Sequence, residues 1–500
     1  MNKRNLNAIS LSFLPIIVII PISINILENL HLGGINLVSE FLVSALLPKL
    51  NSAILISLIS RINETIFIAL TSWFLSILFG IFFGLLSSDI FYEIINLPLV
   101  LGRLIKLFLI LIRSIHELVW GLLLMQIYGI NISVGIISIC IPYVAINAKV
   151  INEQLENIDP KVIKSILEIN GNKFSSLITL VWHPILTTLQ NFGFYRLECA
   201  LRSTAILGLF GLGGLGTSIY LSFKALSFRE LWTYLWSLGI LIIFSKFIIK
   251  HAFLKNFNSK LRVIIFIGTL ILSICSLFYF FNFLSNPSYS LNYSLEHLYD
   301  LKNNFISYSL IKLIYETILL SLFATSIAVS LPPFLSIIFN NRLGNLLMNG
   351  LAFCFRLIPP PITILILIMF NEPSISLAAL SLGLHNAGIT FKLLNSNLNN
   401  LERSQFLALN SIGAPKRISW LYGLFAKQAK SYLAYCSYRS DILIRETAIV
   451  GVVGSIGLGW QLQESISSFA WEEVSIVLLA YSLIVIIGEI INDKIKKNFI

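Results

Sequence analysis

The stretch that decides the fold occurs twice in this chain. Residues 195–216 read YRLECALRSTAILGLFGLGGLG, and residues 438–459 read YRSDILIRETAIVGVVGSIGLG. The tyrosine, two arginines, an acid, Thr-Ala-Ile and most glycines recur at one spacing, 243 residues apart. Arg113 and Arg356 share this offset, and Glu64-Thr65 recurs as Glu316-Thr317 at an offset of 252. Such self-similarity predicts two structural copies of one unit.

Apolar residues dominate the chain on both sides of these stretches. Hydrophobic residues make up 56% of the 500 residues and charged residues only 12%, and the mean hydropathy is +0.85. A soluble domain has about 25% charged residues, so most of this chain must face lipid or other apolar helices. A membrane span needs about 20 apolar residues. Twelve segments qualify: 11–27, 65–87, 104–127, 132–150, 184–207, 231–250, 262–284, 314–338, 346–370, 374–394, 427–453 and 473–491.

These segments predict an all-α polytopic membrane protein with about 12 transmembrane helices, arranged as two parallel six-helix repeats. Each half has an even number of spans, so both halves insert the same way up, about an axis along the membrane normal. We place the first domain at residues 1–255 and the second at residues 256–500. The first span follows Asn2-Lys3-Arg4 and lacks a clear cleavage site, so we interpret it as a retained anchor.

Basic residues predict the orientation, because Lys and Arg accumulate on the cytoplasmic side of membrane proteins. With the N-terminus inside, few basic residues fall in outer segments: Lys49, Arg61, Lys224, Arg229 and Lys302. Many more fall in inner segments: Lys3, Arg4, Arg103, Lys106, Lys149, Lys161, Lys164, Lys173, Lys246, Lys250, Lys255, Lys260, Arg262, Arg342, Arg403, Lys416, Arg417, Lys494, Lys496 and Lys497. Both termini are therefore predicted to be cytoplasmic.

Two predicted cytoplasmic segments, 151–183 and 395–426, interrupt the apolar pattern. In the first, Asp159 and Pro160 suit the start of a helix, Gly171 suits its end, and Pro184 leads into the next span. The second has Gly413 and Pro415 after an amphipathic stretch. We interpret both as short helix pairs that dock a cytoplasmic partner, with a solvated loop as the alternative.

The repeated arginines carry the most informative chemistry. Glu198 and Arg202 are four residues apart, as are Asp441 and Arg445, and such pairs face each other on a helix. This pairing leaves Arg196 and Arg439 as one unmatched positive charge in each copy. An intramembrane charge is costly and usually lines an interior path, and a guanidinium suits tetrahedral oxyanions. The alternative is structural pairing between helices.

Arg113 and Arg356, the other two arginines that repeat at the offset of 243 residues, differ in their surroundings. Arg113 has a possible partner in Glu117, whereas Pro360 stands four residues after Arg356. We include both in the predicted substrate path, together with Arg196, Arg439, Arg202, Arg445, Glu198 and Asp441.

Several other classes of site are excluded or disfavoured. Gly211-x-Gly213-x-x-Gly216 matches a dinucleotide fingerprint, but it lies at the end of a span rather than in a βαβ unit, so we interpret it as a tight turn with close helix packing. The chain has no phosphate-loop motif, and its histidines and cysteines show no metal-ligand spacing. We therefore predict no catalytic residues, no metal and no cofactor. The charge of +11 is spread between apolar runs, which disfavours nucleic acid as a partner.

The glycine and proline spacing of the first cytoplasmic segment resembles the coupling loop of importer permeases of the ATP-binding-cassette class, since Gly171 and Pro184 have that motif's separation. The Tyr-Arg-x-Glu…Arg-x-Thr-Ala-Ile-x-Gly stretch resembles the phosphonate-importer permeases. The resemblance covers about residues 60–250 and 312–492. Ser165 and Leu407 stand where the motif has its glutamate. Ala426 replaces the proline in the second copy, and Ile456 replaces the glycine equivalent to Gly213.

This resemblance implies two permease domains fused in one chain of a bacterial inner membrane, which move a phosphonate, phosphite or phosphate ester inward. It also implies two copies of a cytoplasmic ATPase subunit and an extracytoplasmic substrate-binding protein. Three alternatives stay open: a fused permease for ferric iron, whose path should be acidic, an ion-coupled secondary transporter, and a membrane-embedded enzyme.

The topology can be tested with reporter fusions after residues 170, 255, 410 and 500. All four should report the cytoplasm, because basic residues flank each position. A reporter active on the outer side at any of them would contradict the parallel repeat.

Overall fold

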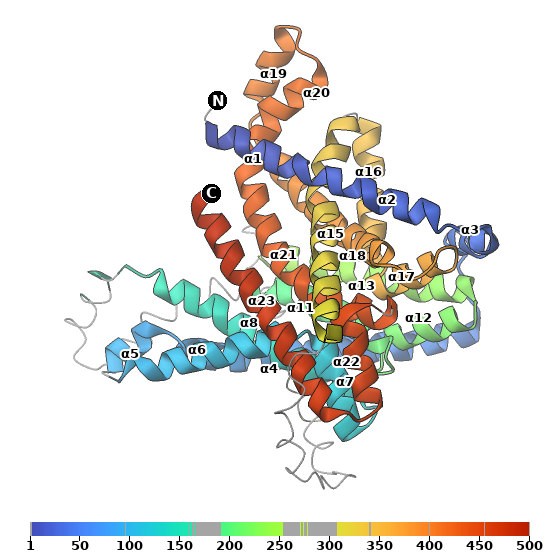
Figure 1. Ribbon diagram of the computed structural model, residues 1–500, viewed down its shortest axis with the longest axis vertical. Coiled ribbons are helices and arrows are strands. Elements are labelled where there is room, and N and C mark those ends of the chain that lie inside the picture. The colour runs from blue at the N-terminus through green and yellow to red at the C-terminus, as the bar shows by residue number, and fades with distance from the viewer. Residues whose placement is uncertain are drawn as a thin grey trace. The chain divides into compact units, whose positions relative to one another are not determined.

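The computed structural model describes residues 3–95, 97–159, 161–162, 165, 192–253, 271, 274, 278, 308–339, 342–399, 401–454 and 456–499. It divides into two compact units (Figure 1). The central unit comprises Ser44–Ser294, and the C-terminal unit comprises Met1–Val43 with Leu295–Ile500. Residues 1–43 thus belong with the second half of the chain, whereas the sequence had placed them in a first domain of residues 1–255.

The central unit is helical throughout its described residues. A long first helix, α4, packs along α8, which in turn packs against α6 and α7. Its helices are α4 (Ser52–Leu86), α5 (Asp89–Ile95), α6 (Leu99–Ser114), α7 (Glu117–Tyr128), α8 (Ile132–Glu156), α11 (Phe194–Gly208), α12 (Leu215–Lys224) and α13 (Phe228–Phe253).

The C-terminal unit is also built of helices, and it includes the N-terminal segment. That segment holds α1 (Lys3–Phe13), α2 (Ile19–Glu28) and α3 (Ile35–Ser44). The remainder comprises α15 (Tyr308–Ile338), α16 (Arg342–Leu357), α17 (Pro360–Ile368), α18 (Ile375–Asn399), α19 (Ser404–Ser411), α20 (Lys416–Trp420), the π-helical turn η5 (Leu421–Phe425), α21 (Ala426–Gly454), α22 (Gly457–Ser467) and α23 (Trp471–Phe499). Helices α16, α17, α18 and α23 begin 243 residues after α6, α7, α8 and α13.

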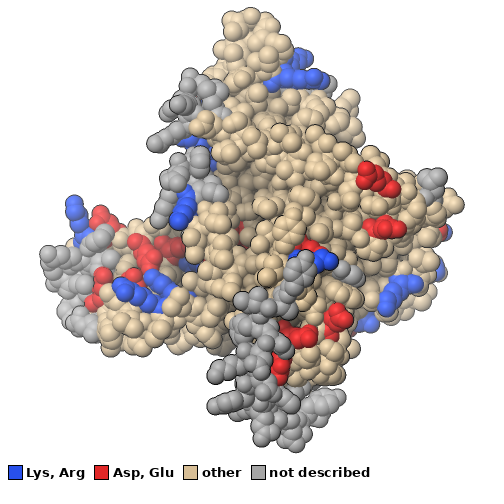
Figure 2. All heavy atoms as spheres, in the orientation of Figure 1, with Lys and Arg blue, Asp and Glu red and all other residues tan. Residues whose placement is uncertain are grey.

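Six described helices are long and apolar enough to cross a membrane: Asn7–Glu28, Ser52–Leu86, Ile132–Glu156, Ser309–Ile338, Ile375–Asn399 and Trp471–Asn492. Bent helix pairs raise this number to nine at most within the described residues. Residues 184–191 and most of segment 262–284 lie outside those residues, so the total of twelve stays a prediction. Broad uncharged surface on the face drawn in Figure 2 fits helices that meet lipid.

Two segments predicted as single spans are sharply broken instead. Segment 104–127 consists of α6 and α7, bent by 86°, and segment 346–370 consists of α16 and α17, bent by 93°. The second bend follows from Pro359-Pro360-Pro361, because proline cannot continue a preceding helix. The first bend has no proline. There His116 has an extended backbone and its Nδ1 accepts the amide N–H of Leu118, so the histidine caps α7.

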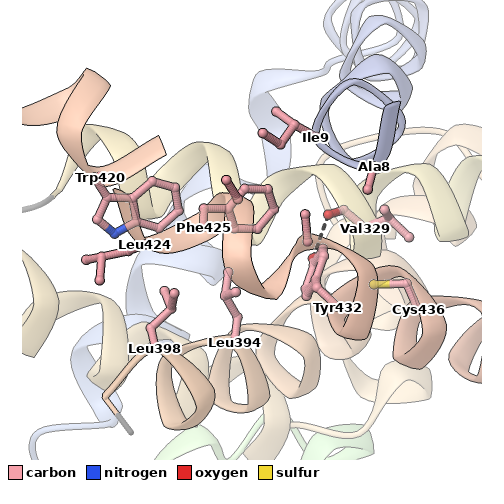
Figure 3. Close-up of a cluster of buried hydrophobic side chains, with 12 residues drawn as sticks. Ala8, Ile9, Val329, Leu394, Leu398, Trp420, Leu424, Phe425, Tyr432 and Cys436 are labelled. Carbon is pink, nitrogen blue, oxygen red and sulfur yellow. Dashed lines mark hydrogen bonds between the residues drawn. The ribbon is translucent and has the colours of Figure 1, made fainter. Parts of the chain in front are cut away.

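The N-terminal helix completes the core of the C-terminal unit. Ala8 and Ile9 of α1 contact a cluster that includes Phe425 and Tyr432 (Figure 3). The Tyr432 hydroxyl donates to the Val329 carbonyl of α15 at 2.6 Å, which satisfies the one polar atom of that buried ring. Burial of apolar surface stabilises this packing by about 25 cal/mol per Å², so the chain's first helix is held by residues more than 300 positions away.

A repeated acid–threonine pair holds the glycine turn of each unit. The amide N–H of Gly214 donates to Glu64 at 2.9 Å and that of Leu215 to Thr65 at 2.8 Å. In the C-terminal unit, the N–H groups of Gly457 and Leu458 donate to Glu316 and Thr317, at 3.2 and 3.0 Å. The first N–H groups of a helix have no partner within it and carry partial positive charge. The repeated Glu-Thr pair and the repeated glycine turn therefore belong together, because the pair caps α12 and α22 from another helix.

The glycines after each arginine helix allow close packing, as the sequence indicated. A Cβ on Gly216 would lie 2.1 Å from the Ala205 carbonyl, and one on Gly459 would lie 2.7 Å from the Ala448 carbonyl. Side chains there would push α12 away from α11 and α22 away from α21. The interpretation as a packing turn is confirmed, and the dinucleotide fingerprint has no βαβ context.

Candidate functional site: a buried arginine cluster in each unit

The two arginines that the predicted pairing leaves over lie inside their units rather than towards lipid. Arg196 of α11 is 7% exposed and Arg439 of α21 is 5% exposed. On α11, Arg202 donates to Glu198 at 2.6 Å, so this predicted pair is confirmed. On α21, the Nε of Arg445 donates to the backbone carbonyl of Asp441 at 3.2 Å, and the Asp441 carboxylate accepts from the Asn492 amide of α23.

Arg196 is surrounded by aromatic rings. Its guanidinium carbon lies 4.9 Å from the ring centre of Tyr143 on α8 and 5.0 Å from that of Phe192. A ring face attracts a cation through its quadrupole. The Tyr143 hydroxyl lies 2.9 Å from the hydroxyl of Ser203, the residue that follows Arg202 on α11.

A carboxylate enters this cluster from α7. The Ser203 hydroxyl donates to Glu117 Oε1 at 2.7 Å, and Glu117 Oε2 lies 3.3 Å from His116 Nε2. Hydrogen bonds thus link Glu117 through Ser203 to Tyr143, whose ring contacts Arg196. The predicted contact of Glu117 with Arg113, which is 9% exposed on α6, stays a prediction.

Arg439 has a different environment, and the charge count for its copy was wrong. Its guanidinium donates to the Asn386 side chain of α18 and lies 3.6 Å from Glu446 Oε1. Asn386 also donates to Glu446 Oε2 at 2.8 Å, so the three side chains form a closed triad. Glu446 lies two helical turns after Arg439 on α21, and therefore the helix compensates Arg439 by itself.

The two clusters place their second carboxylate on different helices. At the offset of 243, Asn386 corresponds to Tyr143, Glu446 to Ser203, and Pro360 to Glu117. The acid is on α7 in the central unit and on α21 in the C-terminal unit. Counted from the sequence alone, the predicted path and this second carboxylate together comprise three arginines and two acids in each unit, which gives a formal charge of +1 in both. The sequence contained this signal, because Glu446 aligns with Ser203 inside the repeated stretch.

Two further residues flank the C-terminal cluster. The Nε of Arg356 donates to the Ala352 carbonyl at 3.1 Å within α16. His385 Nδ1 lies 3.0 Å from the Phe355 carbonyl and 3.3 Å from the Ile358 carbonyl, at the bend between α16 and α17. Carbonyls left without helical N–H partners at a bend need such a donor. His385 is thus a hydrogen-bonded histidine.

The second segment that was predicted to be cytoplasmic, 395–426, includes a helical hairpin of α19 and α20. Gly413 has φ +84°, its N–H donates to the Asn410 carbonyl at 3.0 Å, and the Ala414 N–H donates to the Leu409 carbonyl at 3.1 Å. This is a Schellman ending of α19, and Pro415 then precedes α20. Phe406 packs on Gly423 of η5, whereas Leu407 and Ile412 point outward, 58% and 79% exposed.

Less of the other predicted cytoplasmic segment, 151–183, can be compared with its prediction, because most of it lies outside the described residues. Asp159 accepts the N–H of Lys161 at 2.9 Å, so its predicted capping role is confirmed. The other predicted residues of that loop, Pro160, Gly171 and Pro184, lie outside the described residues.

Fold and clusters define an all-α polytopic membrane protein with charged groups held between its helices. Its sequence is similar to the phosphite transport system permease protein HtxE of Stutzerimonas stutzeri, with 28% identity over 160 residues, 32% of this chain and 61% of that protein. It is also similar to the cryptic phosphonate transport system permease protein PhnE2 of Escherichia coli K12, with 26% identity over 121 residues, 24% of this chain and 99% of that protein. The chain thus spans about three fifths of the length of HtxE.

Other comparisons add little. No family model matches the chain. A solved structure, the crystal structure of an amino acid ABC transporter with histidines, is 16% identical and covers 38% of this chain, but its TM-score of 0.31 carries no argument.

The Glu198–Arg202 pair can be tested for a structural role. Its side chains are only 13% and 20% exposed, so Glu198→Gln leaves a charged Arg202 largely buried and should cost about 3 kcal/mol. Membrane abundance and thermal stability in detergent should both fall. Glu153→Gln is the control, because the Lys149–Glu153 pair is 39% and 55% exposed and should contribute less than about 1 kcal/mol. Equal stability of the two variants would contradict the structural role.

Proposed function

We propose that this protein is the transmembrane permease of an ATP-binding-cassette importer for a small phosphorus oxyanion, such as a phosphonate, phosphite or phosphate ester. The observation that carries the proposal is that each unit holds a buried arginine between its helices, Arg196 in the central unit and Arg439 in the C-terminal unit. An excess of guanidinium over carboxylate in a low-dielectric interior favours anions. The cargo is taken from the names of the relatives, which are phosphite and phosphonate permeases.

The proposed path is lined by the residues of these clusters: Arg113, Arg196, Glu198 and Arg202 in the central unit, and Arg356, Arg439, Asp441 and Arg445 in the C-terminal unit. The net positive charge argues against ferric iron as cargo, because a cation path needs acidic groups. The fusion of two permease domains, with the bacterial inner membrane as location and both termini in the cytoplasm, belongs to the same proposal.

The α19–α20 hairpin supports the coupling part of the proposal. It exposes large apolar side chains, Leu407, Ile412 and Ile418, beside the basic Lys416 and Arg417. Exposed apolar groups of this kind suit a protein partner. We assign this surface to a cytoplasmic ATPase subunit, one of two copies, while an extracytoplasmic binding protein delivers the anion.

The function is tested by uptake of labelled phosphite, methylphosphonate and ferric citrate into cells that express this chain with its ATPase and binding protein. Uptake of a phosphorus compound should require all three components and ATP. Ferric citrate uptake is the control for cargo class. Iron uptake without phosphorus uptake would reject the oxyanion, and uptake without the ATPase would reject the importer class.

Gly413 tests the coupling hairpin separately from the cargo. The space around it is open, with no atom within 4 Å of a Cβ, so a substitution acts through the backbone alone. Gly413→Val forces a β-branched residue to φ +84°, which costs about 1–3 kcal/mol and should unwind the end of α19. Co-purification of the ATPase should fall at least tenfold. Gly413→Asn is the matched control, because asparagine tolerates this conformation, and equal loss in both variants would contradict the argument.

A further inference from the structure

The two units bend at equivalent positions of the repeat, but they hold their bends in different ways. The helix pair α6–α7 is bent by 86°, and the pair α16–α17 by 93°. We propose that the α6–α7 bend of the central unit is a hinge that opens when His116 takes up a proton, whereas the α16–α17 bend is fixed. This proposal goes beyond the proposed function, because it concerns the chain alone and holds for any cargo.

The backbone has nearly the same conformation at both bends. His116 has φ −70° and ψ 150°, and Pro359, which stands 243 residues later, has φ −61° and ψ 143°. The proline ring fixes φ near this value and keeps the preceding residue out of the helical region. Histidine has no such constraint, and its φ and ψ can return to helical values. The α16–α17 bend is therefore built into the covalent structure, whereas the α6–α7 bend depends on side-chain contacts.

The contact that holds the α6–α7 bend is a hydrogen bond to one nitrogen of the His116 ring. The amide N–H of Leu118 donates to Nδ1 at 3.2 Å. An amide N–H can only donate, so Nδ1 has no proton and Nε2 has the proton of the neutral ring, 3.3 Å from Glu117 Oε2. Leu118 is 0% exposed, and a buried N–H group without a partner is costly. The neutral ring therefore stabilises the start of α7.

Protonation of the ring removes this contact. Imidazole is the side chain whose charge ordinarily changes between about pH 5 and pH 8. Both nitrogens of the charged ring are donors, so a proton added to Nδ1 faces the N–H of Leu118 and the cap of α7 is lost. Nε2 keeps its proton beside Glu117, so the carboxylate stabilises the charged ring. Acid therefore opens the hinge, and neutral pH closes it.

The histidine at the other bend keeps its contacts when it is protonated. His385 Nδ1 lies 3.0 Å from the Phe355 carbonyl and 3.3 Å from the Ile358 carbonyl. A carbonyl oxygen can only accept, so this Nδ1 has a proton in the neutral ring and in the charged ring alike. The two bends thus have opposite hydrogen-bond polarity at Nδ1, and acid breaks the contact at only one of these two nitrogens.

The charged groups around the hinge come from the helices that pack against it, since α7 packs on α8 and α11. Ionisable side chains at this end of the packed helices are Arg113 on α6, Glu117 on α7, Tyr143 on α8, and Arg196, Glu198 and Arg202 on α11. Arginine keeps its charge throughout the range in which imidazole titrates. Glu117 also accepts from Ser203 of α11 at 2.7 Å, so opening the hinge changes how α7 meets α11.

The test measures the distance between two spin labels across each bend, in the purified full chain in lipid nanodiscs. The labels are attached to cysteines that replace Leu104 and Tyr128, which are 58% and 45% exposed, after the native cysteines have been replaced by alanine. A control pair at Leu347 and Glu372, both exposed, spans the α16–α17 bend. Each distance is measured at about pH 8 and about pH 5, the limits of imidazole titration.

Acid should lengthen the distance between positions 104 and 128 by about 5 Å, because arms of about 16 and 18 Å, at 1.5 Å per residue, would open by about 30°. His116→Asn should remove this pH dependence, since asparagine accepts from an N–H group at a helix start and has no charge change in this range. The control distance should be the same at both pH values.

An unchanged distance across α6–α7 in the chain with His116 would overturn the hinge. A pH response that persists in His116→Asn would assign the proton to another group, and an equal response across both bends would make it a general effect of acid; each of these results would also overturn the proposal. If His116→Asn does not fold, the comparison of the two bends in the chain with His116 decides. The measurement contains no cargo, ATPase or binding protein, so its outcome and that of the importer proposal are independent.

Discussion

The structure depends on the cost of holding a guanidinium among membrane helices. A charge there must meet an opposite charge, a polar group or an aromatic face, because lipid offers none of these. The partners of Arg196 come from α8 and from the turn before α11, and those of Arg439 come from α18 and α21. Each arginine therefore fixes how its helix packs on the neighbouring long helix. The bends at α6–α7 and α16–α17 lie beside these clusters, which places Glu117 and His385 where their polar atoms have partners.

The buried charges of Arg196 and Arg439, at equivalent positions of the repeat, are stabilised in two different ways. A carboxylate two turns along the helix neutralises Arg439 directly, whereas rings support Arg196 and its unit's second acid sits on another helix. The formal charge of +1 is the same in both clusters, so total charge alone does not distinguish them. What differs is the set of neighbours: Glu446 and Asn386 lie beside Arg439, and two aromatic rings lie beside Arg196. Equal sequence spacing therefore does not imply equal roles.

Much of this could be predicted from local sequence. The apolar runs gave the long helices, the four-residue spacing gave the Glu198–Arg202 pair, and proline gave the bend before α17. The rest depends on contacts between distant segments. The bend before α7 comes from a histidine cap, and residues 1–43 pack with the second half through Ala8 and Ile9. Glu446 is next to Arg445 in the sequence, but its contact with Arg439 spans two turns. That contact is completed by Asn386 of α18, and no spacing rule within one helix predicts a residue from another helix.

The triad of Arg439, Glu446 and Asn386 also suits its place in the chain. The helical path from Lys416 to Gly454 runs through α20, η5 and α21, so it joins the exposed hairpin to the Arg439 triad and then to the glycine turn. From Lys416 to Arg439 this path rises about 35 Å at 1.5 Å per residue. Its π-helical turn at Leu421–Phe425 packs in the same cluster as α1, and such turns often mark functional sites. On the proposed function, a displacement of the hairpin by an ATPase would move Arg439 through this helix. An arginine bonded to Asn386 of α18 would pass that movement to a neighbouring helix.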